Sequence, residues 1–516
     1  MVAEKESNSK PARLGEEALK EAIPYIRKPF YIVSKNGRYA EAYAPACPLE
    51  NLGDPDFCQD HSIRYPYYAG SMAQGISSAE IVEKMAEAGM LGFFGAAGLP
   101  LKTIEAAIER LSQNLGNKPF GFNLIHSPNE PKLEAATADL YIRKGIRLIE
   151  ASAYLEINLP LVRYRVHGIH SDPSGKIITP NRIIAKVSRV EVATKFFSPP
   201  PENLLQELLK SGEISEEQAS LAQKIPMAQD ITAEADSGGH TDNRPALALI
   251  PSMLALCDRM QSKYNYSQKL RVGAAGGIAT PASAAAAFSM GAAYIVTGSV
   301  NQACVESGTS DAVREVLAQT EQADMVMAPA ADMFEMGVKV QVLKRGTMFP
   351  MRAAKLYELY NSYAKIEDIP ASQRSMLEKN FFRAGVDEIW EQTRKYFEER
   401  DNTQIASAEK NPKHKMALIF RWYLGQTAHW AISGDPARKI DCQIWCGPAM
   451  GAFNEWVKGT GLEKASNRKV VSVALNILHG AAVMMRLSAL RSQGVNLVSE
   501  LSPRPIDESS LKDYLK

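Results

Sequence analysis

The stretch Met227-Ala-Gln-Asp-Ile-Thr-Ala-Glu-Ala-Asp-Ser-Gly-Gly-His-Thr-Asp-Asn-Arg-Pro245 carries the pattern around which the rest of the chain is organised. Its first half predicts a buried strand and the run from Pro245 predicts a helix, so two glycines and a histidine lie where a strand passes into a helix. Glycines allow positive φ angles and a close approach of a ligand to the backbone, and the first turn of a helix offers free N–H groups. The imidazole of His240 can donate or accept a proton near neutral pH. A tight turn with a surface histidine explains the same local pattern equally well.

Seven further strand-like runs lie on either side of this stretch and alternate with helix-like runs. The first of them leads into the small-residue loop Gly70-Ser-Met-Ala-Gln, and Ser78 is placed as the N-cap of the next helix. Strands that alternate with helices predict a parallel sheet, and eight of them over about 235 residues predict an α/β fold with a closed (β/α)8 TIM barrel. We place this barrel at residues 61–329 and expect an irregular insert or lid at 155–225. The predicted strands start at Tyr65, Leu91, Phe120, Arg147, Arg182, Met227, Leu270 and Ala292.

The segments outside the barrel differ from it in composition. Residues 1–60 predict an N-terminal preface with a β-hairpin, because Asn36-Gly37 separates two strand-like runs. Residues 330–465 are rich in methionine, aromatic residues and paired charges and predict a helical accessory domain. Residues 466–516 predict a C-terminal helix that returns to the barrel, Val470–Ser492, and a peripheral tail.

Composition limits the classes of function. The 516 residues are 45% hydrophobic and 23% charged, as in globular proteins, and the net charge of +1 gives no reason to expect a nucleic acid or a membrane as partner. The N-terminus shows no signal-peptide pattern, and the most apolar late run, 470–485, falls short of the roughly 20 residues that span a bilayer. The six scattered cysteines predict no metal site and favour a reduced, cytoplasmic setting.

The loops at the C-terminal ends of the predicted strands carry the candidate site residues, because catalytic groups of TIM barrels gather there. Gly273-Ala-Ala-Gly-Gly-Ile follows the seventh strand and Thr297-Gly-Ser the eighth, and from these two loops barrels often build a phosphate site with backbone N–H groups. Structural turns are the competing explanation for the glycines. The spacing fits neither a Rossmann fingerprint nor a P-loop. The residues that this rule selects include Ser71, Met72, Ala73, Asn123, Ser152, Lys186, Gly238, Gly239, His240, Gly276, Gly277, Gly298 and Ser299.

The combination of Gly-Gly-His, Ala-Gly-Gly-Ile and Thr-Gly-Ser on consecutive strands resembles the superfamily of nitronate monooxygenases and FMN-dependent enoyl reductases. The finer resemblance is to the PfaD family, the trans-acting enoyl reductases of polyunsaturated fatty acid and polyketide synthases. It spans about residues 24–503. It rests on Glu234–Pro245, on Met327-Ala-Pro-Ala-Ala-Asp-Met-Phe-Glu-Met-Gly-Val-Lys-Val-Gln-Val-Leu-Lys-Arg-Gly-Thr-Met-Phe-Pro-Met-Arg-Ala353, and on Ile444-Trp-Cys-Gly-Pro-Ala-Met-Gly-Ala-Phe-Asn454.

The resemblance implies FMN in the barrel mouth and NADPH as the reductant. It matches the first-strand loop to backbone beside the isoalloxazine, a third-strand amide to a polar contact, and the glycine loops to a phosphate grip. The cofactor-binding residues that it implies are Ser71, Met72, Ala73, Asn123, Lys186, Gly238, Gly239, Gly276, Gly277, Gly298 and Ser299.

Lys186 and His240 are the catalytic residues that the resemblance implies. A cation such as Lys186 near the flavin pyrimidine edge would stabilise the negative charge that follows hydride arrival at N5; a solvated surface lysine is the alternative. His240 would stabilise the enolate that forms when hydride reaches Cβ of an enoyl thioester, or protonate Cα. Asp236 stands where many superfamily members carry a small residue, and it either caps the turn or orients a neighbour.

The expected activity is therefore reduction of enoyl thioesters carried by an acyl carrier protein, with the accessory helices as carrier-docking surface or acyl pocket. A nitronate monooxygenase that oxidises nitroalkanes with FMN and O2 is the alternative, and a scaffold without chemistry is a third. A homodimer is the default expectation for the oligomeric state.

Overall fold

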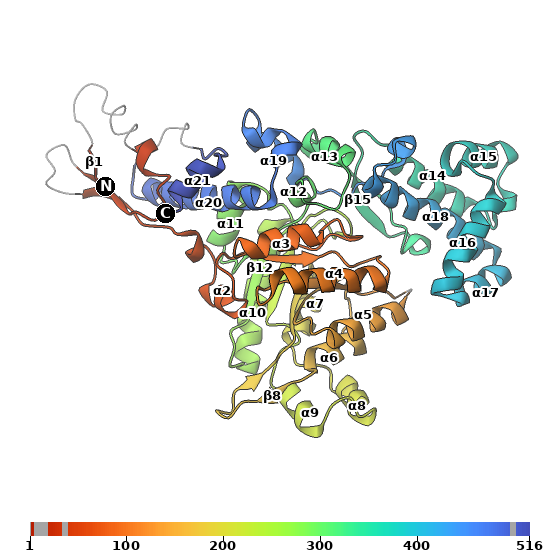
Figure 1. Cartoon of the computed structure of the whole chain (residues 1–516), viewed down its shortest axis with the longest axis horizontal. Coiled ribbons are helices and arrows are strands. Elements are labelled where there is room, and N and C mark those ends of the chain that lie inside the picture. Colours follow the sequence, from red (N-terminus) through yellow and green to blue (C-terminus); the bar gives the residue numbers. More distant parts are fainter. Residues whose placement is uncertain (1, 5–18, 34–39, 129, 496–501) are drawn as a thin grey trace.

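The computed structural model describes residues 2–4, 19–33, 40–128, 130–495 and 502–516 (Figure 1). The chain forms a barrel surrounded by helices, an arm that carries both ends of the chain, and a lobe of helices on the other side. Separate hydrophobic cores fill the barrel region and the lobe.

Eight parallel strands close into a barrel, which confirms the predicted (β/α)8 fold. The last strand pairs with the first, with Ile295 beside Tyr67 and Thr297 beside Ala69. Aromatic side chains fill the interior, so the barrel is a packed core and not a pore. The strands are β4 (Tyr67–Ala69), β5 (Leu91–Phe94), β6 (Gly121–Ile125), β7 (Leu148–Ser152), β10 (Arg182–Val187), β11 (Asp230–Glu234), β12 (Arg271–Ala275) and β13 (Ile295–Thr297).

Helices cover the outside of the barrel, each placed after the strand that it follows in the sequence (Figure 1). The predicted start signals act as expected: Ser78 Oγ accepts from the N–H of Ile81 and so caps the first of these helices. The helices are α3 (Ala79–Glu87), α4 (Leu101–Leu115), α5 (Pro131–Arg143), α6 (Leu159–Val166), α7 (Val190–Phe197), α10 (Ala246–Tyr264) and α11 (Pro281–Ser289). The short helix α12 (Ser299–Gln302) begins where β13 ends, at the barrel mouth.

The insert expected at 155–225 is present, but it is built of regular elements and it is not a lid. Besides α6, β10 and α7, this region forms the short hairpin β8 (His170–Ser171) and β9 (Ile177–Ile178) and the helices α8 (Glu202–Lys210) and α9 (Glu216–Ala222). These added elements precede strands β10 and β11, so they lie at the N-terminal end of the barrel, away from the mouth where a lid would act. Figure 1 shows them at the lower end of the molecule, remote from the lobe of helices.

The N-terminal preface contains strands β1 (Val2–Glu4), β2 (Phe30–Val33) and β3 (Ala40–Ala44), followed by η1 (Leu49–Asn51) and α2 (Pro55–Asp60). Strands β2 and β3 pair antiparallel, as a hairpin requires. The predicted turn residues Asn36-Gly37 lie outside the described residues.

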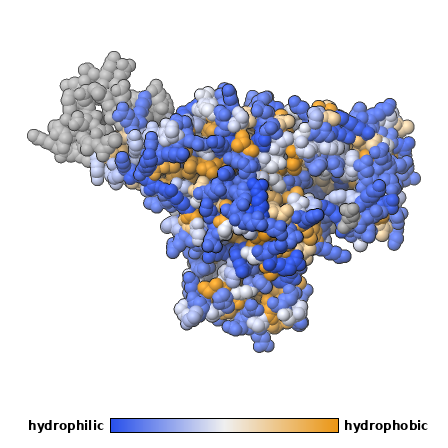
Figure 2. Space-filling view, in the orientation of Figure 1, coloured by the Kyte–Doolittle hydropathy of each residue, from blue (hydrophilic) through white to orange (hydrophobic). Residues whose placement is uncertain are grey.

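The accessory region begins with a hairpin that the sequence did not suggest, β14 (Met325–Pro329) and β15 (Lys339–Leu343). The strands are short and lie among methionine-rich, helix-like residues, which hid their alternation. The lobe is otherwise helical, and Figure 2 shows a mostly hydrophilic surface on this face of it. Its elements are η3 (Phe334–Met336), α14 (Phe349–Ser362), η4 (Ile366–Asp368), α15 (Ala371–Met376), η5 (Leu377–Phe382), α16 (Val386–Arg400), α17 (Asn402–Lys410), α18 (Pro412–Ser433) and η6 (Pro436–Asp441).

The C-terminal helix α20 (Val470–Ser492) returns to the barrel and packs against α11 and α3. It is the one helix among the described residues that is long and apolar enough to cross a membrane, and 78% of its most apolar window is buried inside the protein, as in a core helix. The tail is not peripheral as expected, because α21 (Glu508–Tyr514) buries Leu511 and stacks Tyr514 on His479 of α20. The remaining elements are α13 (Asp311–Ala318), η2 (Gln322–Asp324), α19 (Ala449–Val457), η7 (Gly461–Glu463) and η8 (Ala465–Asn467).

Candidate active site

The turn after β11 is held by the accessory hairpin. Gly239 N–H donates to the carbonyl of Gln341 on β15 (2.9 Å), and Gln341 N–H donates back to the carbonyl of Gly239 (2.7 Å). The side chain of Gln341 donates to Asp236 Oδ1 (2.8 Å) and to the carbonyl of Ser237 (2.7 Å). Asn243 also donates to Asp236 Oδ1 (2.8 Å). Asp236 therefore ties its own turn to the hairpin, which favours a structural role for this residue.

Gly238 marks a second contact between the turn and the accessory region. A Cβ at Gly238 would lie 2.8 Å from the backbone N and C of Cys446, so only glycine allows this approach. Gly447, which follows Cys446 in the sequence, donates its N–H to Ser299 Oγ (3.0 Å). The segment around Cys446 thus joins the loops after β11 and β13, and the three long sequence motifs meet at one place.

His240 lies on this turn with its side chain 35% exposed, and its Nε2 is 3.0 Å from Asp332 Oδ2. Asp332 belongs to the segment between β14 and η3. Burial alone would lower the pKa of His240, but the hydrogen bond and the charge of Asp332 outweigh burial and raise the pKa above its ordinary value. The other ring nitrogen, Nδ1, has no hydrogen bond to any residue that the structure describes.

Lys186 is not a surface lysine. Its side chain, on β10, is 17% exposed, and Nζ lies 3.4 Å from Glu234 Oε1 and 4.0 Å from Glu150 Oε2. Burial disfavours the charged form of Lys186, but the two carboxylates outweigh burial and raise the pKa of the ammonium. Burial also raises the pKa of Glu234, and Lys186 offsets this only in part. The group is a fixed cation at the barrel mouth.

Glu150 on β7 connects Lys186 to the first-strand loop. Its carboxylate is fully buried and accepts from Ser71 N–H (3.2 Å), Ser71 Oγ and Tyr68 O–H (3.1 Å). Asn123, 4% exposed, donates to the carbonyl of Glu150 (3.1 Å) and to Ser152 Oγ (3.0 Å). These hydrogen bonds gather β4, β6 and β7 around one polar cluster, to which Lys186 of β10 adds its charge.

Met72 and Ala73 continue the first-strand loop as a tight turn. The Met72 carbonyl accepts from Ser77 N–H (3.2 Å) and the Ala73 carbonyl accepts from Ile76 N–H (3.2 Å). Both side chains are partly buried. The loop is therefore rigid and still accessible at the mouth.

The glycine loop after β12 has the features of an anion cradle. Gly276 and Gly277 both have φ of +76°, and neither N–H donates to another described residue. A Cβ at Gly276 would lie 2.5 Å from the carbonyl carbon of Ala235, whereas Cβ atoms at Gly277 or Gly298 would meet no atom within 4 Å. The unbonded N–H groups of Gly276 and Gly277, with open space at Gly277 and Gly298 and the start of α12 at Ser299, fit a phosphate of the FMN type.

Sequence patterns placed Lys186, Asn123, Ser71 and the glycine loops at one end of the barrel, where the structure brings them together. They missed Glu150. The available signal was a charged residue inside an otherwise apolar predicted strand. They also missed the pairing of His240 with Asp332 and of the turn with Gln341. Both partners lie in a motif that the resemblance had already marked.

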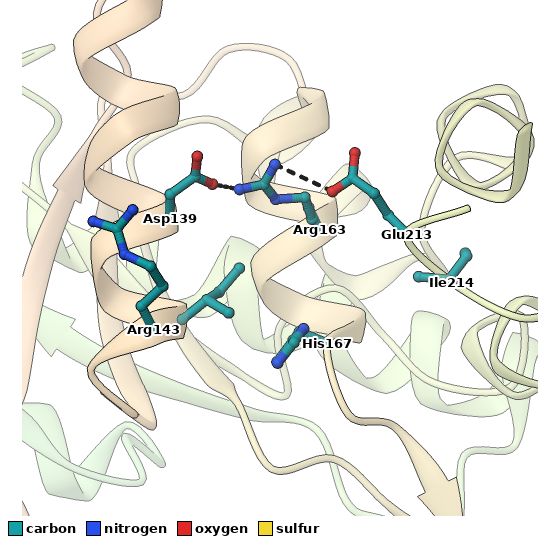
Figure 3. Close-up of a pocket in the computed structure, with 7 residues that line it drawn as sticks. Asp139, Arg143, Arg163, His167, Glu213 and Ile214 are labelled. Atoms are coloured by element: carbon teal, nitrogen blue, oxygen red, sulfur yellow. Dashed lines mark ion pairs between the residues drawn. The ribbon is translucent and has the colours of Figure 1, made fainter. Parts of the chain in front are cut away.

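The pocket drawn in Figure 3 lies elsewhere. Arg163 of α6 stands between Asp139 of α5 and Glu213, with 3.1 Å between Arg163 Nη1 and Glu213 Oε2. His167 and Arg143 flank this group. These residues come from outer helices and from the segment before β11, so the pocket is separate from the strand ends.

Similarity to known proteins extends over most of the chain. A family model described as nitronate monooxygenase matches residues 56–385, and a model described as [Acyl-carrier-protein] S-malonyltransferase, inserted helical domain, matches residues 363–442. The crystal structure of the enoyl reductase domain of MlnA, from the macrolactin biosynthesis cluster of Bacillus amyloliquefaciens, has 43% sequence identity and a TM-score of 0.81 and covers 86% of this chain and 100% of its own.

Two curated relatives are similar over most of the chain. The polyketide biosynthesis protein PksE of Bacillus subtilis is 46% identical over 466 residues, and a polyunsaturated fatty acid synthase protein of Thraustochytrium sp. is 47% identical over 453 residues. These matches cover 90% and 86% of this chain but 60% and 30% of the relatives.

Proposed function

The chain belongs to the nitronate monooxygenase family, in the branch related to polyketide and polyunsaturated fatty acid synthase proteins, and from this premise we propose that it is an FMN-dependent enoyl reductase. It would use NADPH and act in trans on enoyl thioesters carried by an acyl carrier protein. The observation that carries the proposal is the grouping, at one barrel mouth, of an N–H cradle, the partly buried cation Lys186 and the paired His240.

The residues at the mouth suit FMN. Gly276, Gly277, Gly298 and Ser299 would hold its phosphate, and Lys186 would supply the cation that a reduced isoalloxazine needs. FMN bound there would supply the hydride-transfer chemistry between NADPH and Cβ of the enoyl thioester. Ser71 is held by Glu150, so the loop that would lie beside the ring is fixed before any ligand enters.

His240 would act on the other half of the reaction. Hydride arrival at Cβ puts negative charge on the thioester oxygen, which a hydrogen-bond donor stabilises before Cα takes a proton. Because Asp332 raises the pKa of His240, the imidazole is more often protonated near neutral pH than an ordinary histidine and is suited to donate. The net change is the addition of one hydride and one proton across the double bond.

The helical lobe is an argument for a substrate that is bound to a carrier protein. Its residues 363–442 match the inserted helical domain of a malonyltransferase that is named for its acyl carrier protein. The lobe is joined to the mouth by Gln341 and Cys446, so a carrier that docks on it would deliver its arm near His240.

Nitronate monooxygenase activity is the second candidate, because the matched family carries that name. In that reaction His240 would take a proton from a nitroalkane, which requires the neutral imidazole. The similar proteins that cover most of this chain are named for polyketide and polyunsaturated fatty acid synthesis and for an enoyl reductase domain, so reduction is the better fit.

Anaerobic NADPH oxidation tests the proposal. Protein loaded with FMN should oxidise NADPH when crotonyl or longer enoyl thioesters on a carrier protein are added. A yellow protein that stays silent with all such thioesters would contradict reduction, and oxygen uptake with a nitroalkane in the absence of NADPH would establish the second candidate. Colourless protein that resists FMN loading would point to a scaffold.

A further inference from the structure

The pairing of His240 with Asp332 joins two parts of the chain that are 92 residues apart in sequence. His240 lies on the barrel turn, and Asp332 lies on the segment between β14 and η3 of the accessory region. The distance from Nε2 to Oδ2 is 3.0 Å, so Nε2–H donates to the carboxylate. Nδ1 keeps no hydrogen bond to a described residue and is the ring atom left for a ligand.

The backbone around the pair fixes its geometry. The two hydrogen bonds between Gly239 and Gln341 join the residue before His240 to the strand that follows Asp332. The side chain of Gln341 adds bonds to Asp236 and to the Ser237 carbonyl. A surface ion pair between two mobile side chains contributes little, but here the turn that carries His240 is bonded to the hairpin whose connecting segment contains Asp332.

The charges around the pair favour a protonated ring. Asp332 and, more weakly, Glu234 face the imidazole. Burial would raise the pKa of the Asp332 carboxyl, but the hydrogen bond and charge of His240 and, to a smaller extent, the charge of Arg421 on α18 keep it below its ordinary range. Glu335, in the following element η3, instead lies 3.4 Å from Arg421 and 3.5 Å from His414 of α18. Asp332 therefore pairs with His240, and Glu335 pairs with α18.

We propose that Asp332 is a positioning residue that binds His240 through Nε2–H, holds the ring as an imidazolium and leaves Nδ1–H to donate to the substrate carbonyl. The catalytic unit is thus completed by the accessory region and not by the barrel alone. This role rests on the proposed function of His240, but the protonation and orientation of the ring can be tested without it.

The test compares Asp332→Asn with Glu335→Gln in FMN-loaded protein. The asparagine in the first variant keeps the shape of the side chain and removes its charge, and the Glu335 variant removes a carboxylate from the same segment that does not touch His240. The pKa of His240 is measured by NMR on protein labelled in the histidine rings, with His240→Gln identifying its signal among the eight histidines. Enoyl-thioester reduction and flavin reduction by NADPH are followed separately over pH.

A raised pKa keeps the imidazolium, and with it the donor, present to higher pH. Asp332→Asn should lower the pKa of His240, move the alkaline limb of enoyl-thioester reduction to lower pH, and reduce the rate by roughly 10- to 100-fold at alkaline pH, the range found for partners that orient functional histidines in metal sites. Flavin reduction by NADPH should stay unchanged, and Glu335→Gln should match the parent in every readout.

Two outcomes overturn the role of Asp332. One is an unchanged pKa of His240 in Asp332→Asn, and the other is an equal loss of rate in both variants. If the parent protein reduces no enoyl thioester but the His240 signal still shifts, the pairing holds and only the proposed reaction fails.

Discussion

Gly277 and Gly276 form a matched pair for testing the phosphate cradle. Both have φ of +76°, where an alanine costs about 1–2 kcal/mol. Gly277→Ala meets no atom within 4 Å, so its cost to folding should stop there. Gly276→Ala also forces Cβ to 2.5 Å from the Ala235 backbone, which adds about 1–3 kcal/mol of overpacking and brings the total to roughly 2–5 kcal/mol.

FMN binding separates the two effects. Flavin at 100 times its Kd stabilises a protein by about 2.7 kcal/mol. In the Gly277→Ala variant the methyl group would occupy the open space beside the free N–H groups. The apoprotein should then melt only a few degrees below the parent and gain almost nothing from added FMN.

The assay is thermal unfolding of each protein over a series of FMN concentrations, with bound flavin measured by absorbance after gel filtration. The parent should show a midpoint that rises with FMN. If Gly277→Ala gains as much from FMN as the parent does, the phosphate is held elsewhere and the cradle is wrong. If Gly276→Ala is as stable as Gly277→Ala, the steric reasoning is wrong.

Three further changes test other parts of the site. His240→Gln should slow enoyl-thioester reduction by about 10²–10⁴-fold and leave flavin reduction by NADPH unchanged in stopped-flow traces; an equal effect on both half-reactions would refute its assignment. Lys186→Met leaves the buried carboxylate of Glu150 and the partly buried one of Glu234 without their cation and should lower the free energy of unfolding by about 3–5 kcal/mol in urea titrations. A loss below about 1 kcal/mol would mean that the lysine is solvated. Asp230→Asn removes the buried carboxylate that lies 2.6 Å from Arg271. Burial would raise the pKa of Asp230, but Arg271 and His61 outweigh burial and hold it at about 2. The stability that this carboxylate contributes is therefore present above the ordinary carboxyl pKa and is lost as pH falls toward 2. Urea unfolding of this variant and the parent should therefore differ most at neutral pH and converge in acid, and a constant difference would contradict the ion pair.

The barrel could be predicted because its signals are local. Each strand ends in a small-residue loop and each helix has its own start, so the order of elements fixes the fold once eight are counted. The same rule places Lys186, Asn123 and Gly276 at the mouth, because the C-terminal ends of all eight parallel strands lie at the same face of a TIM barrel. The hairpin of β14 and β15 was not predicted because its two five-residue strands lie among methionine-rich, helix-like residues, where the short alternation of Lys339–Leu343 was overlooked.

The partners of the site residues could not be predicted from these patterns. Asp332 and Gln341 follow His240 by about 90 to 100 residues, and nothing local specifies which barrel loop they meet. In the sequence Glu150 is only a charged residue inside a predicted strand, which is a weak signal for a site. Its role becomes clear only from the contacts with Ser71 and Lys186 in the structure. The resemblance marked the right segments, but the contacts between them required the structure.

The reoxidation of reduced flavin by a carrier-bound enoyl thioester tests the central claim most directly. Protein loaded with FMN is reduced anaerobically with one equivalent of NADPH and mixed with an enoyl thioester or with its saturated counterpart. The enoyl thioester should restore the oxidised flavin spectrum in a single turnover and yield the saturated acyl chain, and the saturated thioester should leave the flavin reduced. Flavin that stays reduced with the enoyl thioester and is reoxidised only when oxygen is admitted would contradict enoyl reduction at this site.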